Sequence, residues 1–329
     1  MEYAIVIGID HYDQRPLVGA VADADAFAKF LTEKKLVSNS ANVKLLTSTA
    51  TNLITLAHEV DLSFENIVKD ARSRKTENNR LYFYFSGHGI GNTFLNTALC
   101  MRLWSSTYIN NCISSYDYLT GFINKGAFDE ILIFLDCCRE HDTTIKGSSP
   151  IGDWQNKVGD RIPKLIVCNS TIYGKLSYEI TIDSNQKRGA FTSFLIDSLN
   201  GDADLKGSGK ITALDLKKHI DDNFLSYAQK FNKIQSGTVF TDTGGDSIVI
   251  CEVQQLLTEF NCEITFKRNS NVSLLTHQFE EIYRADVTEG EKWKRKLDRG
   301  TYLLKDNNSN DPPKAIFNYS ENTISHDEF

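Results

Sequence analysis

Hydrophobic residues in the first 170 positions of the chain occur in short, unbroken runs. Four of these runs are rich in β-branched and aromatic residues, and a fifth, "VKLLTS", is weaker. Unbroken apolar runs of this length are typical of strands that are covered on both faces, as in a parallel sheet. We therefore predict strands over residues 3–9, 43–48, 81–87, 131–137 and 164–170.

The segments between these runs carry apolar residues at helical spacing, as Phe27 and Leu31 illustrate. Gly126 is placed to end the third of them. Helices are predicted over residues 21–36, 62–75 and 114–126. Because strands and helices alternate, we predict an α/β fold with a mostly parallel sheet sandwiched between helices.

The pattern changes after the fifth run. Helical segments are predicted over residues 189–201 and 211–231, and Thr212 with Asp215 forms the capping-box pattern at the start of the second. The apolar run 246–253 is expected to close the sheet.

Farther along, polar and apolar residues alternate, which predicts strands exposed on one face over residues 262–277 and 291–306. We predict a first domain over residues 1–253 and a small β-rich appended domain over residues 254–329, whose polar C-terminal tail is expected to be partly loose.

The composition narrows the function. The chain has 41% hydrophobic and 24% charged residues and a formal net charge of −7, which is ordinary for a globular protein. The negative balance argues against a general affinity for nucleic acid or for anionic membranes, so neither is an expected partner. No run of eighteen apolar residues occurs, and no membrane-spanning helix is predicted.

The chain opens directly on a predicted strand, "MEYAIVIGID", without the positively charged start or cleavage site of a secretory leader. Its seven cysteines are an odd number, which fits reduced thiols better than a disulfide framework. We therefore expect a cytoplasmic protein. The scattered cysteines lack the spacing of zinc ligands, so no metal is expected.

One stretch, "DLKGSGKITALD" (204–215), has the skeleton of a calcium-binding loop. Lys206 stands where a ligating acid or amide belongs, however, and Asp215 replaces the bidentate glutamate. A turn that caps a helix explains the stretch better. The "GSGK" within it lacks the leading glycine and the preceding strand of a phosphate-binding loop.

Two predicted strands end in reactive residues. "YFYFSGHG" ends in His88 between glycines, and "LIFLDCCR" ends in Asp136, Cys137 and Cys138. The carboxyl ends of parallel strands share one edge of the sheet, so both groups are expected in one cleft. A histidine beside a cysteine forms a nucleophile–base pair, in which the thiolate attacks a carbonyl. The alternative for each residue alone is a hydrogen-bonded structural histidine and buried cysteines.

These segments together resemble the caspase-like cysteine peptidases, and among them the bacterial caspase homologues and metacaspases more than the animal caspases. The resemblance covers residues 2–251. It rests on "YAIVIGIDHY", "LVGAVADADAF", "YFYFSGHG", "IFLDCCR" and "RGAFTSFLIDSLNG". The resemblance implies that the predicted α/β fold, with its mostly parallel sheet between helices, is caspase-like. A histidine about fifty residues upstream of a cysteine is the order found in caspases.

The resemblance assigns roles to the reactive residues. The family's histidine lies in its S-G-H-G motif, which implies His88, and its nucleophile follows an acid by two positions, which implies Cys138. By similarity the oxyanion hole uses the backbone N–H groups of Gly89 and Cys138. Such a peptidase needs no metal or organic cofactor, and its partners are protein or peptide substrates.

The resemblance also implies a specificity pocket. The family's pocket positions correspond to Asp23, Ser86 and Asp136, and carboxylates that face one guanidinium allow bidentate recognition. We therefore predict cleavage after Arg, and less well after Lys. Two alternatives stay open: Asp23 as a first-turn helix acid stabilised by the helix dipole, and Asp25 as the pocket acid.

The segment after the nucleophile departs from the family, because Arg139-Glu140 replaces the common His-Ser-Gly. The polar loop 140–164 stands where relatives are often cut during activation. We expect cleavage at exposed basic residues, either by the peptidase itself or by an activating protease. A regulatory protein is a further expected partner. The candidate sites are Lys146, Lys157, Arg161, Lys187 and Arg188.

Two further hypotheses were compared with a peptidase. A catalytically silent caspase-like scaffold would bind a protein partner through residues 254–329, but it has no need for both His88 and Cys138. A nucleotide-binding domain lacks a glycine-rich loop after the first strand. At the level of the family, a role in bacterial stress or defence is expected.

Overall fold

The structure is a computed structural model that describes residues 1–53, 56–74, 76–182, 186–204, 208–242, 248–253, 262–298, 300–318 and 324–328. It divides into two compact units. The first consists of Met1–Ile196 with Phe224–Ile248, and the second of Asp197–Asn223 with Val249–Phe329. Neither boundary tests the predicted division at residue 253, which remains a prediction.

The first unit is built on a six-stranded sheet of order β13-β9-β7-β3-β1-β2. All neighbours are parallel except β13, which is antiparallel to β9. The strands are β1 (Glu2–Ile9), β2 (Val43–Ser48), β3 (Arg80–Ser86), β7 (Glu130–Asp136), β9 (Lys164–Asn169) and β13 (Thr238–Thr241). The predicted α/β class and the five predicted strands are confirmed, each within one residue of its predicted end.

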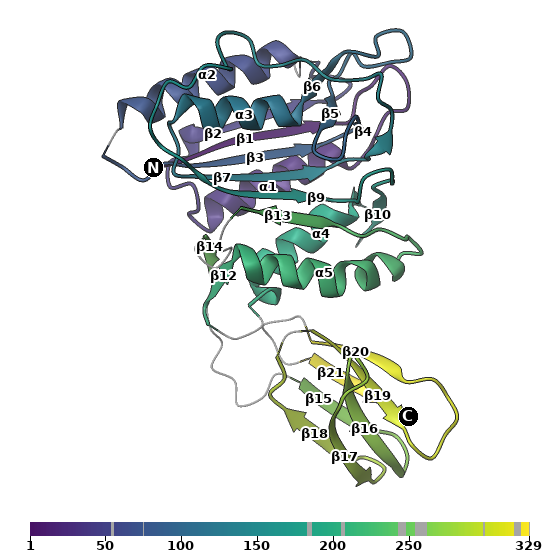
Figure 1. Cartoon of the computed structure of the whole chain (residues 1–329). Helices are drawn as coiled ribbons and strands as arrows, with labels where there is room; N and C mark the ends of the chain where they lie inside the picture. Colours follow the sequence, from purple (N-terminus) through teal and green to yellow (C-terminus); the bar gives the residue numbers. More distant parts are fainter. Residues whose placement is uncertain are drawn as a thin grey trace. The chain divides into compact units, whose positions relative to one another are not determined.

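Helices cover both faces of this sheet (Figure 1). On one face, α2 (Ala57–Ser73) and α3 (Ser115–Lys125) pack through Phe64 and Phe122 onto Phe83 of β3. Gly126 ends α3 in the left-handed conformation, as predicted, with φ 57°. On the other face, Phe27 of α1 (Ala20–Glu33) stacks on Tyr84, with ring centroids 4.4 Å apart.

The prediction for residues 246–253 is wrong. Strand β14 (Val249–Glu252) pairs with β12 (Lys210–Thr212) in a separate two-stranded sheet, and β13 closes the main sheet instead. Because β13 is an edge strand, only Val239 is buried in it and Phe240 is 59% exposed. Strand β13 is therefore less hydrophobic than residues 246–253. For this reason the sequence favoured residues 246–253 as the strand that closes the main sheet.

A small sheet that was not predicted lies beside the strand ends. Its order is β6-β5-β4-β8. The strands are β4 (Gly89–Gly91), β5 (Thr97–Cys100), β6 (Cys112–Ser114) and β8 (Glu140–His141). Strand β4 directly follows His88, and β8 begins two residues after Cys138. The small sheet therefore fixes the chain on the far side of both reactive residues.

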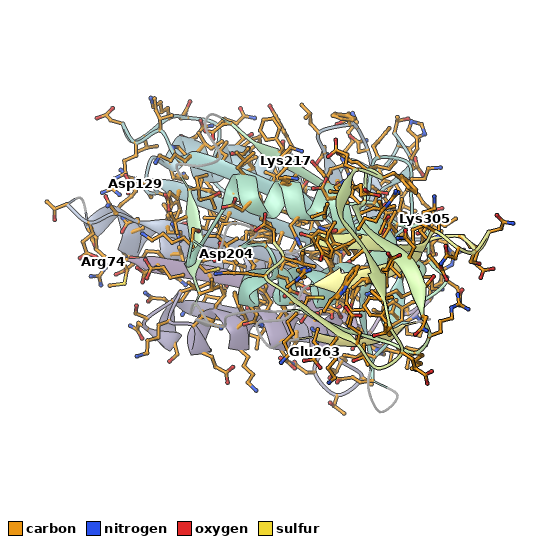
Figure 2. The ribbon with its side chains drawn as sticks, turned by 90° about the horizontal axis from the view of Figure 1, so that it is seen from below. Arg74, Asp129, Asp204, Lys217, Glu263 and Lys305 are labelled. Atoms are coloured by element: carbon orange, nitrogen blue, oxygen red, sulfur yellow. The ribbon has the colours of Figure 1, made fainter. Side chains whose placement is uncertain are left out.

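The helices α4 (Ala190–Asp197) and α5 (Ala213–Gln229) correspond to the last two predicted helices. The predicted capping box is present: Thr212 N–H donates to the Asp215 carboxylate (3.0 Å), and Asp215 N–H donates to Thr212 Oγ1 (3.2 Å). Asp204, labelled in Figure 2, accepts hydrogen bonds from the N–H groups of Ser208 and Gly209. Both Asp204 carboxylate oxygens are therefore engaged by backbone N–H groups of the same stretch. Lys206 lies outside the described residues.

The C-terminal part of the second unit is β-rich, as predicted, and has a core of its own that contains Phe266, Leu274 and Trp293. Glu263, labelled in Figure 2, pairs with Lys292 at 2.8 Å between two neighbouring strands of one sheet. Its two sheets have the orders β18-β15-β21 and β17-β16-β19-β20. The strands are β15 (Cys262–Phe266), β16 (Ser270–Thr276), β17 (Glu281–Val287), β18 (Lys292–Arg295), β19 (Gly300–Asp306), β20 (Lys314–Asn318) and β21 (Ile324–Glu328).

Strands β20 and β21 lie within the tail that is expected to be partly loose, and that expectation remains a prediction. Strand β20 pairs with β19, and β21 pairs with β15, so both gain backbone hydrogen-bond partners that the polar sequence alone does not reveal. Among the residues that the structure describes, no helix combines the length and the apolar character needed to cross a membrane.

Candidate active site

The reactive residues meet because β3 and β7 are parallel neighbours in register. Ser86 at the end of β3 lies opposite Asp136 at the end of β7. The N–H of Gly87 donates to the Asp136 carbonyl (3.3 Å) and holds the two strand ends together. A cleft of about 330 Å³ opens there, and five of the six predicted site residues line it, namely Asp23, Ser86, His88, Asp136 and Cys138.

The two adjacent cysteines differ in their surroundings. Cys137 is 2% exposed and packs inside the fold, whereas Cys138 is half-buried in the cleft wall. The Cys138 sulfur accepts a hydrogen bond from Ser177 N–H (3.3 Å) and faces the Ser177 carbonyl (3.5 Å). Burial raises the pKa of the Cys138 thiol, so the thiol holds its proton in this state.

His88 is held by three groups around its ring and backbone. Its N–H donates to the Tyr12 hydroxyl (2.9 Å), and its ring lies 4.6 Å from the Tyr12 ring and 5.6 Å from the Trp104 ring. Its Nε2 lies 2.7 Å from the Arg15 carbonyl. Because a carbonyl only accepts, Nε2 carries the proton and Nδ1 is left as the basic nitrogen. Burial lowers the pKa of His88, which favours the neutral ring.

Gly89, the sixth predicted residue, packs directly on the nucleophile loop. A Cβ at this position would lie 2.5 Å from the Cys137 sulfur and 2.7 Å from the Cys138 carbonyl oxygen. Only a glycine allows this approach, which brings the backbone of residues 89 and 138 side by side. The role of their N–H groups as oxyanion donors stays a prediction.

Asp23 reaches the cleft because α1 is fixed against the sheet. The Asp10 carboxylate caps the helix by accepting the N–H of Ala20 (2.8 Å). A Cβ on Gly8 would lie 2.6 Å from the Ala24 Cβ, so this glycine lets the helix lie close on β1. Asp23 is consequently 1% exposed and turned toward the strand ends. Asp23 lies in the first turn of α1, as the alternative of a first-turn helix acid has it, but it is buried and lines the cleft. Asp25 is exposed and is not among the residues that line the cleft.

The two acids of the cleft are buried and close to each other. Asp136 accepts hydrogen bonds from the Ser177 hydroxyl (2.8 Å) and from the N–H (3.0 Å) and hydroxyl (2.7 Å) of Thr192. Asp23 accepts from the Ser86 hydroxyl (3.3 Å). Burial raises the pKa of Asp136, while burial and the nearby Asp136 charge raise the pKa of Asp23 to about 7. Two such acids favour a cationic ligand.

Sequence reasoning missed three groups that complete the site. Ser177 contacts both Cys138 and Asp136, and the Gln235 amide donates to the Ser177 hydroxyl (2.9 Å). Arg188 donates through Nε to Asp23 Oδ1 at 2.5 Å. No motif surrounds Ser177 or Gln235, and their partners lie about forty or more residues away, so only the tertiary structure reveals them.

The candidate self-cleavage residues fall in different environments. Lys146 and Lys157 are exposed in the loop after the nucleophile, and Lys187 is exposed in the β10–β11 hairpin (Glu179–Thr181, Lys187–Gly189). Arg161 is half-buried and ion-paired with Asp129. Arg188 is paired with Asp23 inside the fold, with 11% side-chain exposure. The structure therefore favours the lysines over the two arginines.

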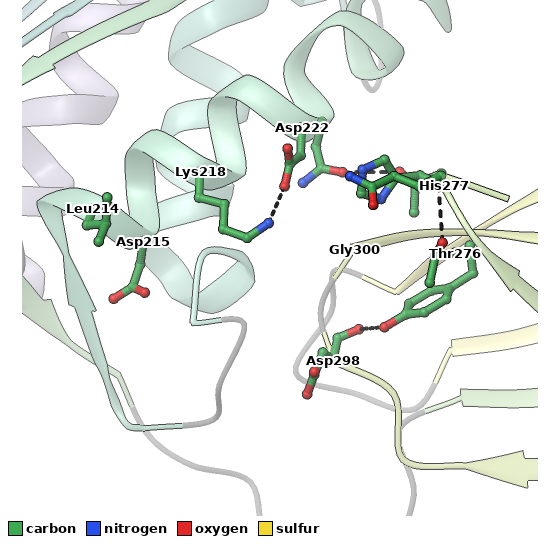
Figure 3. Close-up of a pocket in the computed structure, with 12 residues that line it drawn as sticks. Leu214, Asp215, Lys218, Asp222, Thr276, His277, Asp298 and Gly300 are labelled. Carbon is green, nitrogen blue, oxygen red and sulfur yellow. Dashed lines mark hydrogen bonds and ion pairs between the residues drawn. The ribbon is translucent and has the colours of Figure 1, made fainter. Parts of the chain in front are cut away.

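Other sites offer less chemistry. Within the described ranges, no cluster of three or more His, Cys, Asp or Glu side chains has metal-binding geometry. A pocket within the second unit is lined by residues that include Asp215, Lys218 and Asp222 (Figure 3). Lys218 pairs with Asp222 at 2.6 Å, and Asp215 belongs to the capping box. These charged side chains therefore already interact within α5 and its N-terminal cap.

Comparison with known proteins completes the description of the cleft. A search of curated proteins finds no match to the chain. A model of the caspase domain family matches residues 1–264, well over half of the chain, and this range contains every residue of the cleft. The chain therefore belongs to the caspase domain family of cysteine peptidases.

Proposed function

We propose that the chain is a cysteine endopeptidase that cleaves proteins after basic residues, Arg before Lys. The observation that carries this proposal is the shared cleft, in which a half-buried thiol, a neutral histidine and two buried carboxylates line one cavity. Family membership supports protein substrates, and the acidic wall supports the basic preference.

In the proposed reaction His88 Nδ1 takes the proton of Cys138 as the sulfur attacks the peptide carbonyl. The N–H groups of Gly89 and Cys138 receive the oxyanion, each worth about 3 kcal/mol of transition-state stabilisation. The amine leaves with a proton from His88, and water then hydrolyses the thioester. The Arg15 carbonyl keeps the ring in the required tautomer.

The described state precedes this reaction. The Cys138 sulfur is hydrogen-bonded to the backbone of Ser177. No hydrogen bond between His88 and Cys138 appears among the described contacts. Binding of a substrate, or cleavage at Lys146 or Lys157, would displace the Ser177 segment in this account. The proposed chemistry uses side chains and backbone groups of the chain alone.

The test uses purified protein and fluorogenic peptides that differ only in Arg, Lys or Asp before the reporter. We expect release after Arg, weaker release after Lys, and loss of both in Cys138→Ala and His88→Ala. Release after Asp would keep the peptidase but reject the basic pocket. Full activity in Cys138→Ala would reject the nucleophile.

A silent scaffold is the second candidate, and the Ser177–Cys138 contact is the observation that favours it. If wild type stays inactive after limited trypsin treatment that cuts at Lys146 or Lys157, the scaffold becomes the better account.

A further inference from the structure

We infer that Arg188 is a specificity-determining residue, which keeps the Asp23 carboxylate ionised for a basic substrate side chain without itself occupying the cleft. This inference rests on the proposed function, because it concerns the acidic wall of the same site. It makes Arg188 a positioning residue that acts through Asp23.

The geometry places Arg188 behind the wall of the cleft. In β11 the neighbours Lys187 and Gly189 line the cavity, whereas Arg188 lies between them and is not among the lining residues. Its guanidinium reaches Asp23 Oδ1 at 2.5 Å, while Gly189 N–H binds the other oxygen at 2.8 Å. Asp23 is thus held from one side and faces the cavity from the other.

A contribution to the stability of the fold does not explain the Arg188–Asp23 ion pair well. Asp23 is 1% and Arg188 11% exposed, so both charges are removed from water. A buried pair contributes little net stability unless all its groups are satisfied. Within the part of the chain that the structure describes, the buried Nη2 of Arg188 has no hydrogen-bond partner, so this pair falls short of that condition. Its value lies in the charge it maintains on Asp23.

Asp23 needs such a cation because an acid lies on its other side. The ideal Cβ of Gly189 would lie 2.2 Å from Asp136 Oδ2 and 2.7 Å from Asp23 Oδ2, so the two carboxylates flank one narrow gap. Without a cation, mutual repulsion would protonate one of them. Arg188 opposes this by lowering the pKa of Asp23 against burial and the Asp136 charge, which raise it.

The other charged and titratable groups near Asp23 do not replace Arg188. Tyr84 of β3 is buried, and the Asp23 and Asp136 charges help raise its pKa, so it stays neutral. Glu179 is engaged by the N–H groups of Val18 and Gly19. Lys187 and Lys233 line the cleft, and the Lys233 ammonium lies over the Tyr178 ring at 5.0 Å. Neither lysine is paired with Asp23 in the described contacts.

The test compares wild type, Arg188→Gln and Arg188→Lys as full-length chains, with KM and kcat for an arginyl peptide measured from pH 5.5 to 9. In Arg188→Gln, the midpoint of the fall of KM with rising pH should move to higher pH. The value of kcat should change less than KM. At a pH below the midpoint, KM rises about tenfold for each unit that the pKa of Asp23 increases. Arg188→Lys should restore the wild-type midpoint.

Controls separate this effect from simple loss of packing. Arg74→Gln removes an arginine that pairs with Asp70 at the opposite edge of the sheet, and it should change neither KM nor its pH dependence. In an Asp23→Asn background, Arg188→Gln should have no further effect on KM, because the two residues act as one unit. An equal KM midpoint in wild type and Arg188→Gln would overturn the inference.

A second readout does not require peptidase activity. An acid whose pKa is raised in the folded state loses stability as pH rises from its unfolded pKa to its folded pKa, here from 3.8 to about 7. Removing Arg188 extends that loss to higher pH, so the difference in Tm between wild type and Arg188→Gln should widen between pH 6 and 9. A constant difference would contradict the inference even if no peptide is cleaved, which separates its failure from that of the proposed function.

Discussion

At the residue scale, the cleft depends on two glycines, which have no side chain to fill it, as much as on the reactive side chains. Gly189 sits between the two buried acids and donates its N–H to Asp23. Gly89 allows the nucleophile loop to approach the histidine loop. Burial distinguishes the two adjacent cysteines, because Cys138 is half-buried in the cleft wall whereas Cys137 is 2% exposed and belongs to the hydrophobic core.

Gly189→Ala should abolish binding of a basic side chain. The added methyl would lie 2.2 Å from Asp136 Oδ2, far inside contact distance, so the two carboxylates or the β11 backbone must move. We expect kcat/KM for an arginyl peptide to fall at least about a hundredfold, which corresponds to roughly 2.7 kcal/mol.

Gly121→Ala is the matched control, since its methyl comes no closer than 3.2 Å to another group, the Phe64 ring on the other face of the sheet. It should leave kcat/KM within about twofold. Near wild-type activity in Gly189→Ala would show that the gap between the acids is not the binding position.

The pH profiles of kcat/KM and kcat should distinguish the titration of the pocket acid Asp23 from that of the base His88. In the free enzyme Asp23, whose pKa is raised to about 7, is protonated below that value, so kcat/KM should fall as pH drops through about 7. A bound cation lowers the pKa of Asp23 in the complex, and the pKa of His88 is already below its usual value. The fall in kcat should therefore occur at a lower pH than the fall in kcat/KM. Coincident profiles would contradict the role of Asp23.

At the scale of the elements, continuous apolar runs predicted the central strands because both faces of those strands are covered. The three-residue strands β4 and β6 escaped prediction, since elements this short exist only through their partners. Strand β13 escaped because an edge strand needs few apolar residues. The same limit applies to the site: His88, Asp136 and Cys138 end strands and are visible in the sequence. The Arg188–Asp23 pair joins residues 165 positions apart.

The start of α5 offers a test at this scale. In the capping box, Asp215 accepts the Thr212 N–H and hydroxyl, so Asp215→Ala should lower the free energy of unfolding by about 1 kcal/mol. Asp221→Ala, which removes an exposed i,i+4 pair with Lys217, should change it by less than about 0.5 kcal/mol. Urea denaturation measures both, and equal effects would mean that the cap is not formed.

At the scale of the whole molecule, the β-rich C-terminal region has the signs of an independent fold. Its core of buried residues, among them Phe266, Leu274 and Trp293, is drawn from residues 262–316 alone. Whether the boundary lies near residue 253, as predicted from the sequence, is a question about folding that a fragment can answer.

Residues 254–329 expressed alone should therefore fold, because this core does not depend on the peptidase sheet. We expect a dispersed amide NMR spectrum and a cooperative thermal transition. A collapsed spectrum without a transition would show that the fold of this region requires residues 197–223, with which it shares a unit.

The central claim is that Cys138 is the nucleophile of a pocket that selects a basic side chain. The most direct measurement is irreversible labelling with a peptidyl-arginine chloromethyl ketone and its aspartyl counterpart, followed by mass spectrometry of the peptide that contains residues 131–139. The account predicts one adduct, on Cys138, formed by the arginyl reagent and much more slowly by the aspartyl one. An adduct on Cys137, or faster reaction with the aspartyl reagent, would contradict it.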